Sequence, residues 1–459
     1  MSSEYPLVEA LKENKRKIKH RFHVPAGAVN PFVYELTELP GLDTLPSPAG
    51  VIKEAQEKCA AYFGSSGSFF LVNGSTAGIA ASLLATCSRG DKVLLPRNLH
   101  SSVVSGLVFS GAEPEFIPVE ETAEGFPLNI HPRRVSAHLQ EDRYKVVFAT
   151  SPSYQGVSCD LFTLGEVIEK HGGFFVVDEA HGGHFCFSKE FPASASEAGA
   201  NLWVNSAHKT LGALTPGALL HVSGDRVDRD RLQFFLNMLQ TSSPSYPVMA
   251  SLDLVKSIPA AEWDRLLEWA RYARLNISRE TGFRCLEEED LPPGFSLDPL
   301  RLTVFTAETG LSGQDALNLL RQEFGIEVEM AGEDYFLVIF QPGLEGESVK
   351  ALLEGLRHLS RRNNKGKFRP PEKKMNYPLP EMQELPADAV SAGWREVKME
   401  EAAGEVSAVT VSVYPPGIPV LIPGEEISLK LISLLREKIN RGDAVTGIKE
   451  NGRMKVVRV

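Results

Sequence analysis

The sequence predicts an α/β protein with a large, doubly wound domain on a mostly parallel sheet, a smaller α/β domain and a C-terminal α+β domain. Short apolar runs alternate with helical segments from Val51 onward, which is typical of parallel strands connected by helices. The chain has 459 residues, 43% hydrophobic and 23% charged, so it is long enough for several domains and has an ordinary globular composition.

The N-terminal arm is expected over residues 1–50 and the large domain over residues 51–255. Leu7, Leu11 and Ile18 among many lysines predict a short amphipathic helix between residues 5 and 20. A turn-rich segment, 25–50, follows it. The large domain is expected to have helices at 51–63 and 76–87 and strands at 68–72, 92–96, 114–119, 145–150 and 174–180. Loops at the carboxyl ends of such strands are expected to hold the ligand.

A smaller α/β domain is expected over residues 256–362, after a long helical region at 231–277. Its segments are expected in the order strand, helix, strand, strand, helix, at 298–307, 313–324, 326–331, 335–341 and 347–359. Residues 363–378 are predicted to be an exposed basic linker. The C-terminal domain, 379–459, is expected to contain a strand at 406–415, turns at 415–426 and a helix at 427–439.

The charge balance argues against general attraction to nucleic acid or to an anionic membrane surface. The chain has 48 Lys and Arg against 59 Asp and Glu, a net charge of −11, which favours a cationic small molecule instead. Its five cysteines show no disulfide or zinc-ribbon spacing, and no apolar run approaches the length of a membrane span. We therefore expect a cytoplasmic protein without an export signal or a transmembrane anchor.

The first candidate site is Asn73-Gly74-Ser75-Thr76-Ala77-Gly78, between an expected strand and an expected helix. A glycine-containing turn at a helix start offers backbone N–H groups and two hydroxyls, which suit a phosphate. The alternative is a helix cap in which Ser75 or Thr76 accepts from the first-turn amides.

The second candidate is the segment 174–185, FFVVDEAHGGHF, where a buried strand delivers Asp178 and His181 at its end. An NTPase or helicase site is disfavoured because the chain contains no GxxxxGK[ST] phosphate loop. A zinc site at His181, His184 and Cys186 is disfavoured because no further ligand stands out. An Asp that caps the next turn beside a buried His and a partner for a cofactor both stay open.

The third candidate is Asn205-Ser206-Ala207-His208-Lys209-Thr210. Lys209 lies between apolar segments, and partial burial lowers the pKa of an amine toward nucleophilic behaviour. A Schiff-base role is therefore plausible for Lys209, and an exposed lysine at a helix end is the alternative. A phosphate site, an Asp at a strand end and a later lysine, in this order, are what a pyridoxal 5'-phosphate (PLP) enzyme requires.

The chain resembles the Orn/Lys/Arg decarboxylases, in particular their short bacterial form. The resemblance runs through FFLVNGSTAG, GDKVLLPRNLHSS, TSPSYQGV, VVDEAHGGHF, SAHKTLGALTPGALLHV, TSSPSYPVMASLD and YPPGIPVLIPGE. It implies the fold type I, aspartate-aminotransferase-like architecture for the large domain, with PLP as the cofactor.

The resemblance also implies a role for individual residues. Lys209 is expected to bind the cofactor as a Schiff base, with His208 beside it helping proton transfer. Asp178 is expected to hold the ring nitrogen protonated, and His100 to stack on the ring. The remaining expected contacts are Ala180 with the ring, His181 with the phenolic oxygen, Ser75, Thr76 and Ser206 with the phosphate, and Thr241 or Ser242 with the phosphate of a neighbouring subunit.

Three segments depart from the family pattern. A PGHK-like sequence is replaced by residues 23–30, HVPAGAVN, which lack its polar pair. Ser101 replaces a lysine that follows the stacking histidine, and Val409 replaces an acidic residue before YPPGIP. These changes raise the question of whether the substrate end of the site has altered.

The function expected from the resemblance is decarboxylation of arginine, lysine or ornithine to the amine, for polyamine biosynthesis, by a homodimer or higher homo-oligomer. Two alternatives stay open. One is another fold type I reaction, of the aminotransferase or α-oxoamine synthase kind. The other is a diverged PLP-binding protein with little turnover.

Overall fold

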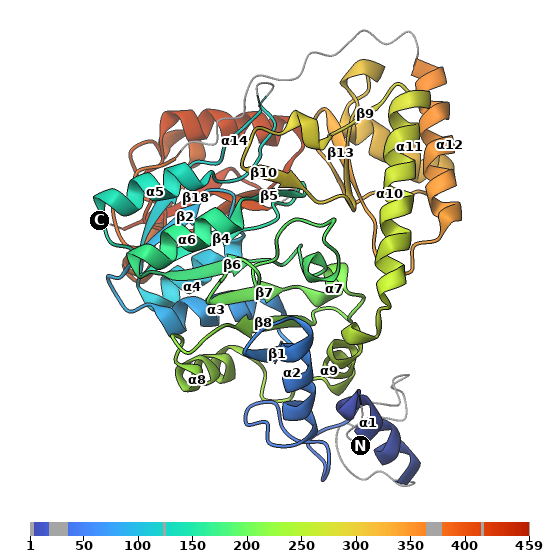
Figure 1. The fold of residues 1–459 in the computed structure, drawn as a ribbon. Coiled ribbons are helices and arrows are strands. Elements are labelled where there is room, and N and C mark those ends of the chain that lie inside the picture. Colours follow the sequence, from blue (N-terminus) through green and yellow to red (C-terminus); the bar gives the residue numbers. More distant parts are fainter. Residues whose placement is uncertain (1–3, 18–34, 123–124, 364–378, 415–416, 459) are drawn as a thin grey trace.

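The computed structural model describes residues 4–17, 35–122, 125–363, 379–414 and 417–458. The predicted N-terminal helix is confirmed as α1, Pro6–Lys17, and Ile18 and the segment 23–30 lie outside the described residues. Leu7 and Leu11 are buried, and the amide of Leu7 donates to Asp253 Oδ2 at 3.2 Å. Helix α1 thereby packs against α2, Val51–Tyr62, and α9, Tyr246–Asp253, at the end of the molecule away from the C-terminal unit (Figure 1).

The large unit is built on a seven-stranded sheet, which confirms the predicted mostly parallel sheet. The strand order is β1-β8-β7-β6-β4-β2-β3, and only β8 runs antiparallel to its two neighbours. The strands are β1 Gly67–Leu71, β2 Lys92–Pro96, β3 Glu113–Ile117, β4 Val146–Thr150, β6 Phe174–Asp178, β7 Leu202–Asn205 and β8 Ala218–Val222. Most of their side chains are buried, as expected for strands covered by helices on both faces.

Helices cover the two faces of this sheet in separate groups (Figure 1). Apolar side chains of α3, α4 and α8 pack against one face of the sheet. Apolar side chains of α5 and α6 pack against the other face. The helices of this unit are α2 Val51–Tyr62, α3 Gly74–Thr86, α4 Ser101–Ser110, α5 Pro132–Glu141, α6 Leu161–His171, α7 Ala207–Thr210, α8 Arg229–Leu239 and α9 Tyr246–Asp253, with a 3-10 turn at Phe185–Phe187.

The helical region predicted at 231–277 is divided rather than continuous. Helix α8 ends before the turn-forming segment 240–245, α9 is followed by the 3-10 turn Leu254–Ser257, and α10 spans Ala260–Glu280. Pro259 stands at the N-cap of α10 and separates it from this 3-10 turn, because a proline cannot donate to a continuing helix. Among the described helices, none combines the length and the apolar character needed to cross a membrane.

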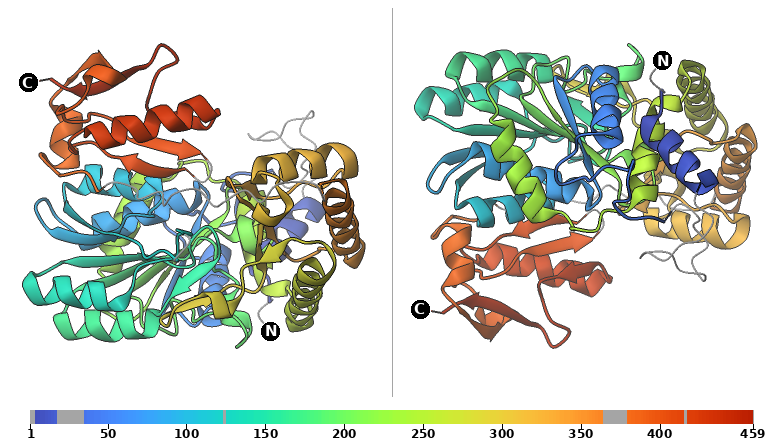
Figure 2. Two further views of the ribbon diagram at one scale, coloured as in Figure 1. Left: turned by 90° about the horizontal axis from the view of Figure 1, so that it is seen from above. Right: turned by 90° about the horizontal axis from the view of Figure 1, so that it is seen from below.

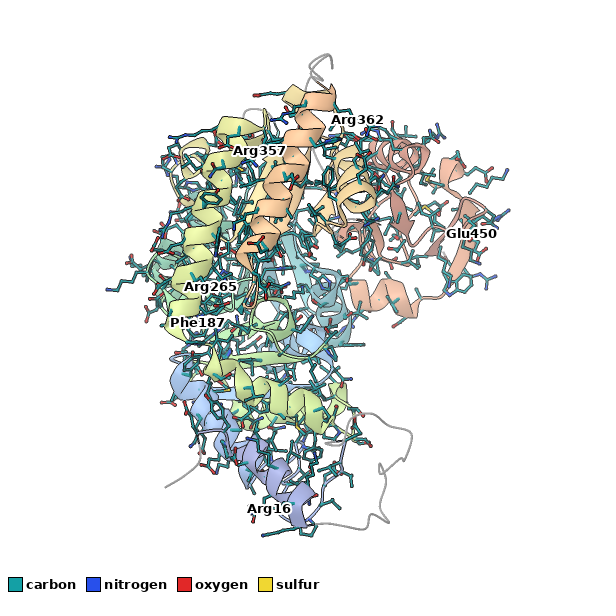
Figure 3. The ribbon with its side chains drawn as sticks, turned by 90° about the vertical axis from the view of Figure 1, so that its right-hand side faces the viewer. Arg16, Phe187, Arg265, Arg357, Arg362 and Glu450 are labelled. Atoms are coloured by element: carbon teal, nitrogen blue, oxygen red, sulfur yellow. The ribbon has the colours of Figure 1, made fainter. Side chains whose placement is uncertain are left out.

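The smaller unit is an antiparallel sheet covered by long helices. Its strands lie in the order β12-β13-β11-β9, and a separate strand, β10, pairs with β5 of the large unit. Helices α10 and α12 run side by side, and Arg357 of α12 donates to Glu280 of α10 (Figure 3). The elements are β5 Val157–Cys159, β9 Arg284–Cys285, β10 Phe295–Leu297, β11 Arg301–Phe305, α11 Gly313–Phe324, β12 Met330–Ala331, β13 Tyr335–Ile339 and α12 Gly346–Asn363, with 3-10 turns at Glu288–Asp290 and Ala307–Thr309.

The C-terminal unit is α+β, as predicted, and lies against a different part of the large unit from the smaller sheet (Figure 2). Its elements are α13 Pro386–Ser391, β14 Trp394–Lys398, β15 Val411–Tyr414, β16 Ile418–Leu421, α14 Leu429–Arg441, β17 Ala444–Thr446 and β18 Arg453–Val457, with a 3-10 turn at Met399–Glu401. The predicted turn region 415–426 contains β16, which pairs with β15 and buries three of its four residues. Most of the predicted basic linker, 364–378, lies outside the described residues.

A buried ion pair joins the C-terminal unit to the large unit. Arg97, directly after β2, donates from Nη1 to Glu425 Oε1 at 2.7 Å and from Nη2 to Glu425 Oε2 at 3.0 Å. Their side chains are 5% and 0% exposed, and Arg97 also donates to the carbonyl of Val420. Because Arg97 precedes the loop that carries His100, this contact connects the C-terminal unit to one edge of the candidate site.

We expect Arg97→Met to lower the free energy of unfolding by about 3–5 kcal/mol, because it leaves the Glu425 carboxylate buried without a cation. The matched control is Arg89→Met, which removes an exposed ion pair with Asp388 between the same two units and should cost roughly 0–1 kcal/mol. Urea unfolding of both variants measures the difference. Equal losses in the two variants would contradict this assignment.

Candidate active site

The three sequence motifs meet at one edge of the central sheet. Strand β6 ends at Asp178, strand β7 ends at Asn205, and β1 leads into the turn before α3. These three strands run in the same direction, so their carboxyl ends lie at the same edge. The predicted ligand-holding loops therefore come together, as the α/β topology requires.

Lys209 lies in the short helix α7, and its amine is directed toward the strand-end segment that follows β6. Its Nζ atom lies 3.1 Å from His181 Nε2. The side chain is partly buried, as predicted from its apolar flanks, and the exposed-lysine alternative is excluded. Desolvation lowers the pKa of Lys209, the charge of Asp178 raises it, and the charge of Arg301 lowers it again.

Asp178 and His100 lie within electrostatic range of Lys209. Asp178 is buried, and its Oδ1 accepts a hydrogen bond from the amide of Ala180. This contact is the turn cap that was the alternative interpretation of Asp178. Burial raises the pKa of Asp178, while the charges of His100 and Lys209 lower it. His100 is an exposed residue, yet desolvation lowers the pKa of its ring, Asp178 raises it and Lys209 lowers it.

A cluster of hydroxyl groups and amides lies at the start of α3. Ser206 is fully buried, and its hydroxyl donates to Ser75 Oγ at 2.9 Å. The N-cap residue of α3 is Asn73, whose side chain makes no capping bond to the helix, and Thr76 is exposed in the first turn. The first-turn amides together with these hydroxyls suit an anion such as a phosphate.

The remaining predicted residues take different positions. Ala180 is buried, and His208 Nδ1 bonds to the carbonyl of Gly217 at 2.9 Å. Thr241 and Ser242 are exposed in the segment after α8, and the amide of Thr241 lies 3.3 Å from Asn73 Oδ1 of the same chain. Thr241 therefore borders the start of α3 in its own subunit.

Two of the family departures can also be located. Ser101 is the first residue of α4, next to His100, which caps that helix by accepting from Ser102. Val409 is partly buried and packs against the apolar core of the C-terminal unit.

Four site residues escaped the sequence analysis, and all are charged or polar. Arg301, at the start of β11, is 1% exposed and lies 2.5 Å from His181 Nδ1 through Nη2. Asp298 pairs with Arg301, and Tyr154 donates to Glu329. The charge of Glu329 acts on the pKa of both Lys209 and Arg301, which places it near the site. The sequence signal that could have identified Arg301 is its position near the start of a mostly apolar strand segment, LRLTVF.

Solved structures share this fold. The chain superimposes on a lysine decarboxylase of Francisella novicida with a TM-score of 0.85 at 19% identity, covering 99% of this chain and 81% of that one. The constitutive lysine decarboxylase of Escherichia coli gives 0.84 at 20% identity, covering 99% and 82%. A serine palmitoyltransferase of Sphingomonas wittichii gives 0.57 at 15% identity, covering 79% and 85%. The fold is therefore that of the fold type I PLP enzymes.

Sequence comparison identifies the family within this class. The profile of the Orn/Lys/Arg decarboxylase major domain matches residues 6–289, and that of the corresponding C-terminal domain matches residues 371–447. An arginine decarboxylase of Bacillus subtilis is 34% identical, covering 99% of this chain and 98% of the relative. An arginine decarboxylase of Bacillus anthracis is 32% identical, covering 97% and 95%. The chain belongs to the Orn/Lys/Arg decarboxylase family.

Glu179, next to Asp178, allows a test of whether burial at this strand end raises the pKa of a carboxyl group. Burial raises its pKa to about 8, although Asn205 and the amide of Ala195 donate to its carboxylate. The folded protein therefore holds a proton that the unfolded chain releases at a lower pH. The contribution of this protonated group to stability is complete below the unfolded pKa of about 4.3 and is lost as the pH rises through about 8.

We expect Glu179→Gln, which stays neutral, to reduce the fall in melting temperature between pH 6 and pH 9. The exposed Glu166→Gln, on α6, is the control and should follow the wild-type profile. Calorimetry across this pH range measures both. A Glu179→Gln profile parallel to the wild type would show that Glu179 is already ionised at pH 6.

Proposed function

We propose that this chain is a PLP-dependent decarboxylase that converts a basic amino acid (arginine, lysine or ornithine) to the amine and CO₂. The observation that carries the proposal is the convergence of Lys209, Asp178 and His100 beside the hydroxyl and amide cluster at the start of α3. Family membership and the names of the arginine decarboxylases of Bacillus support the same reaction.

The residues at the site fit PLP. The cofactor has an aldehyde, a phosphate and a ring nitrogen, and the site offers an amine with a lowered pKa, an anion-binding cluster and a buried carboxylate. When bound, PLP supplies an aldehyde that reacts with amines and a ring that accepts the electron pair left by the departing carboxylate.

Three groups perform most of the chemistry in this proposal. Lys209 uses its amine, which desolvation keeps reactive, to bind the cofactor covalently. Asp178 keeps the ring nitrogen protonated, because a carboxylate in a water-poor site strongly stabilises a positive N–H group. His100, which is an exposed residue, would stack on the ring.

The remaining assigned residues bind or orient. Ser75, Thr76 and Ser206 bind the phosphate, and Ala180 packs against the ring. His181 lies beside the Lys209 amine. There it would contact the phenolic oxygen of the cofactor. His208 is held by the Gly217 carbonyl next to Lys209 and assists proton transfer.

The preference for a basic substrate rests on Glu329. Its exposed carboxylate accepts a hydrogen bond from the Tyr154 hydroxyl. Its charge raises the pKa of both Lys209 and Arg301. Val409 leaves no charge in the position where the family resemblance places an acid. We assign to Glu329 the attraction of the distal cation of the substrate.

The wider assignments belong to the same proposal. The domain limits are 51–255 for PLP binding, 256–362 for the smaller domain and 379–459 for the C-terminal domain. The protein is a cytoplasmic homodimer or higher oligomer that serves polyamine biosynthesis. Thr241 or Ser242 contributes a hydroxyl to the phosphate of the neighbouring subunit. Thr241, which borders Asn73 of its own chain, reaches that position only if the two sites lie close together.

The test is to incubate the purified, PLP-loaded protein separately with arginine, lysine and ornithine, and to measure both CO₂ and the amine. We expect one substrate to give both products at enzyme-like rates. Lys209→Ala should abolish the release, while the exposed Lys170→Ala should leave it unchanged.

Two outcomes would contradict the proposal. A bound cofactor without CO₂ release from any of the three amino acids would exclude basic amino acid decarboxylation. Formation of a 2-oxo acid in place of the amine would indicate an aminotransferase.

A further inference from the structure

Arg301 is a fully buried cation that belongs to the smaller sheet but reaches the candidate active site. Its Nη1 atom donates to the Tyr154 carbonyl at 2.7 Å, and its Nη2 atom lies 2.5 Å from His181 Nδ1. Its aliphatic stem lies against Gly156, where an added Cβ would approach the Arg301 side chain to 2.8 Å. The surroundings thus hold this side chain in one position.

The contact with Arg301 decides which nitrogen of His181 carries the proton. A guanidinium group donates hydrogen bonds and accepts none, so Nδ1 of His181 must offer its lone pair. The ring proton then resides on Nε2 in the neutral imidazole. Nε2 is the atom that lies 3.1 Å from Lys209 Nζ.

The direction of this second hydrogen bond follows. Because His181 Nε2–H donates, the Lys209 nitrogen must accept with its lone pair, which only the neutral amine possesses. We propose that Arg301 is a positioning residue that fixes the His181 tautomer and thereby presents Lys209 as a neutral amine to the aldehyde of the cofactor. This inference rests on the proposed function, since it assumes that the aldehyde belongs to PLP.

The electrostatics of the site agree with this arrangement. Burial first, and then the charge of Arg301, holds the pKa of His181 well below its ordinary value. The charge of Arg301 also lowers the pKa of Lys209, after desolvation. Although burial acts to raise it, the pKa of Asp298 is lowered by His184 and Arg301, so Asp298 stays ionised and compensates the guanidinium.

The experiment follows the covalent attachment of PLP to the cofactor-free protein as a function of pH. In this step the Lys209 nitrogen and the aldehyde carbon form a C=N bond and one water leaves. Borohydride reduction and peptide mass spectrometry confirm that Lys209 is the modified residue.

For Arg301→Gln we expect the pH midpoint of the attachment rate to move upward by about one unit, so that the rate at pH 7 falls about tenfold. At high pH the rates of wild type and variant should converge. Arg301→Lys, which keeps the charge and a donor, should restore the wild-type midpoint. A purely structural role would lower the yield equally at every pH.

The matched control is Arg274→Gln. Arg274 is mostly buried and donates to the carbonyls of Leu286 and of Arg301 itself, so its loss disturbs the same strand without touching His181. We expect its midpoint to stay at the wild-type value. An unchanged midpoint in Arg301→Gln, or an equal shift in Arg274→Gln, would overturn the inference.

A measurement on the unaltered protein keeps the inference testable if Arg301→Gln does not fold. Nitrogen NMR of the protein with labelled histidine, assigned with His181→Gln, should show His181 protonated at Nε2 alone, and a proton on Nδ1 would overturn the inference. The two proposals fail separately. Absence of PLP attachment in the wild type would refute the cofactor assignment, whereas attachment with an unshifted variant midpoint would refute only the role of Arg301.

Discussion

Charges buried in a water-poor pocket must be compensated, and this requirement links the units of the chain at the candidate active site. Asp178 and Arg301 are both buried. Burying an isolated charge costs on the order of several kcal/mol, because the charge loses its hydration. Arg301 is balanced by Asp298, whereas burial raises the pKa of Asp178. The compensation holds only while these side chains, from distant parts of the chain, stay together. The site and the fold therefore support each other.

This constraint also explains why the three units of the chain are connected at the site. The smaller sheet supplies Arg301 and Asp298, and its neighbouring strand β10 pairs with β5 of the large unit. The C-terminal unit reaches the loop before His100 through Arg97 and Glu425. Each connection crosses between units through buried polar groups, which tolerate little displacement because an unpaired polar group in the interior is costly. The geometry around Lys209 is thus a property of the whole chain.

The family relationship extends over nearly the whole chain, with matches to both the major and the C-terminal domain profiles. The relative from Bacillus subtilis shares 34% of its residues over nearly the full length, and the solved lysine decarboxylases share the fold at about 20% identity. Lys209, Asp178 and His100 lie close enough together for their charges to act on one another's pKa. Val409 is an apolar residue that packs against the C-terminal core. Glu329 offers a carboxylate from the segment directly before β12.

The sequence alone predicts the alternating α/β pattern, the mostly parallel sheet and the three motifs that carry Ser75, Asp178 and Lys209. These could be predicted because apolar periodicity reports local structure, and because parallel strands bring their carboxyl ends to one edge. It did not show where the helical region from 231 to 277 divides, or that residues 418–421 form a strand, since tertiary contacts override local propensity. The contact between Arg301 and His181 could not be predicted from the sequence, because it spans 120 residues and depends on how the smaller sheet packs on the large one.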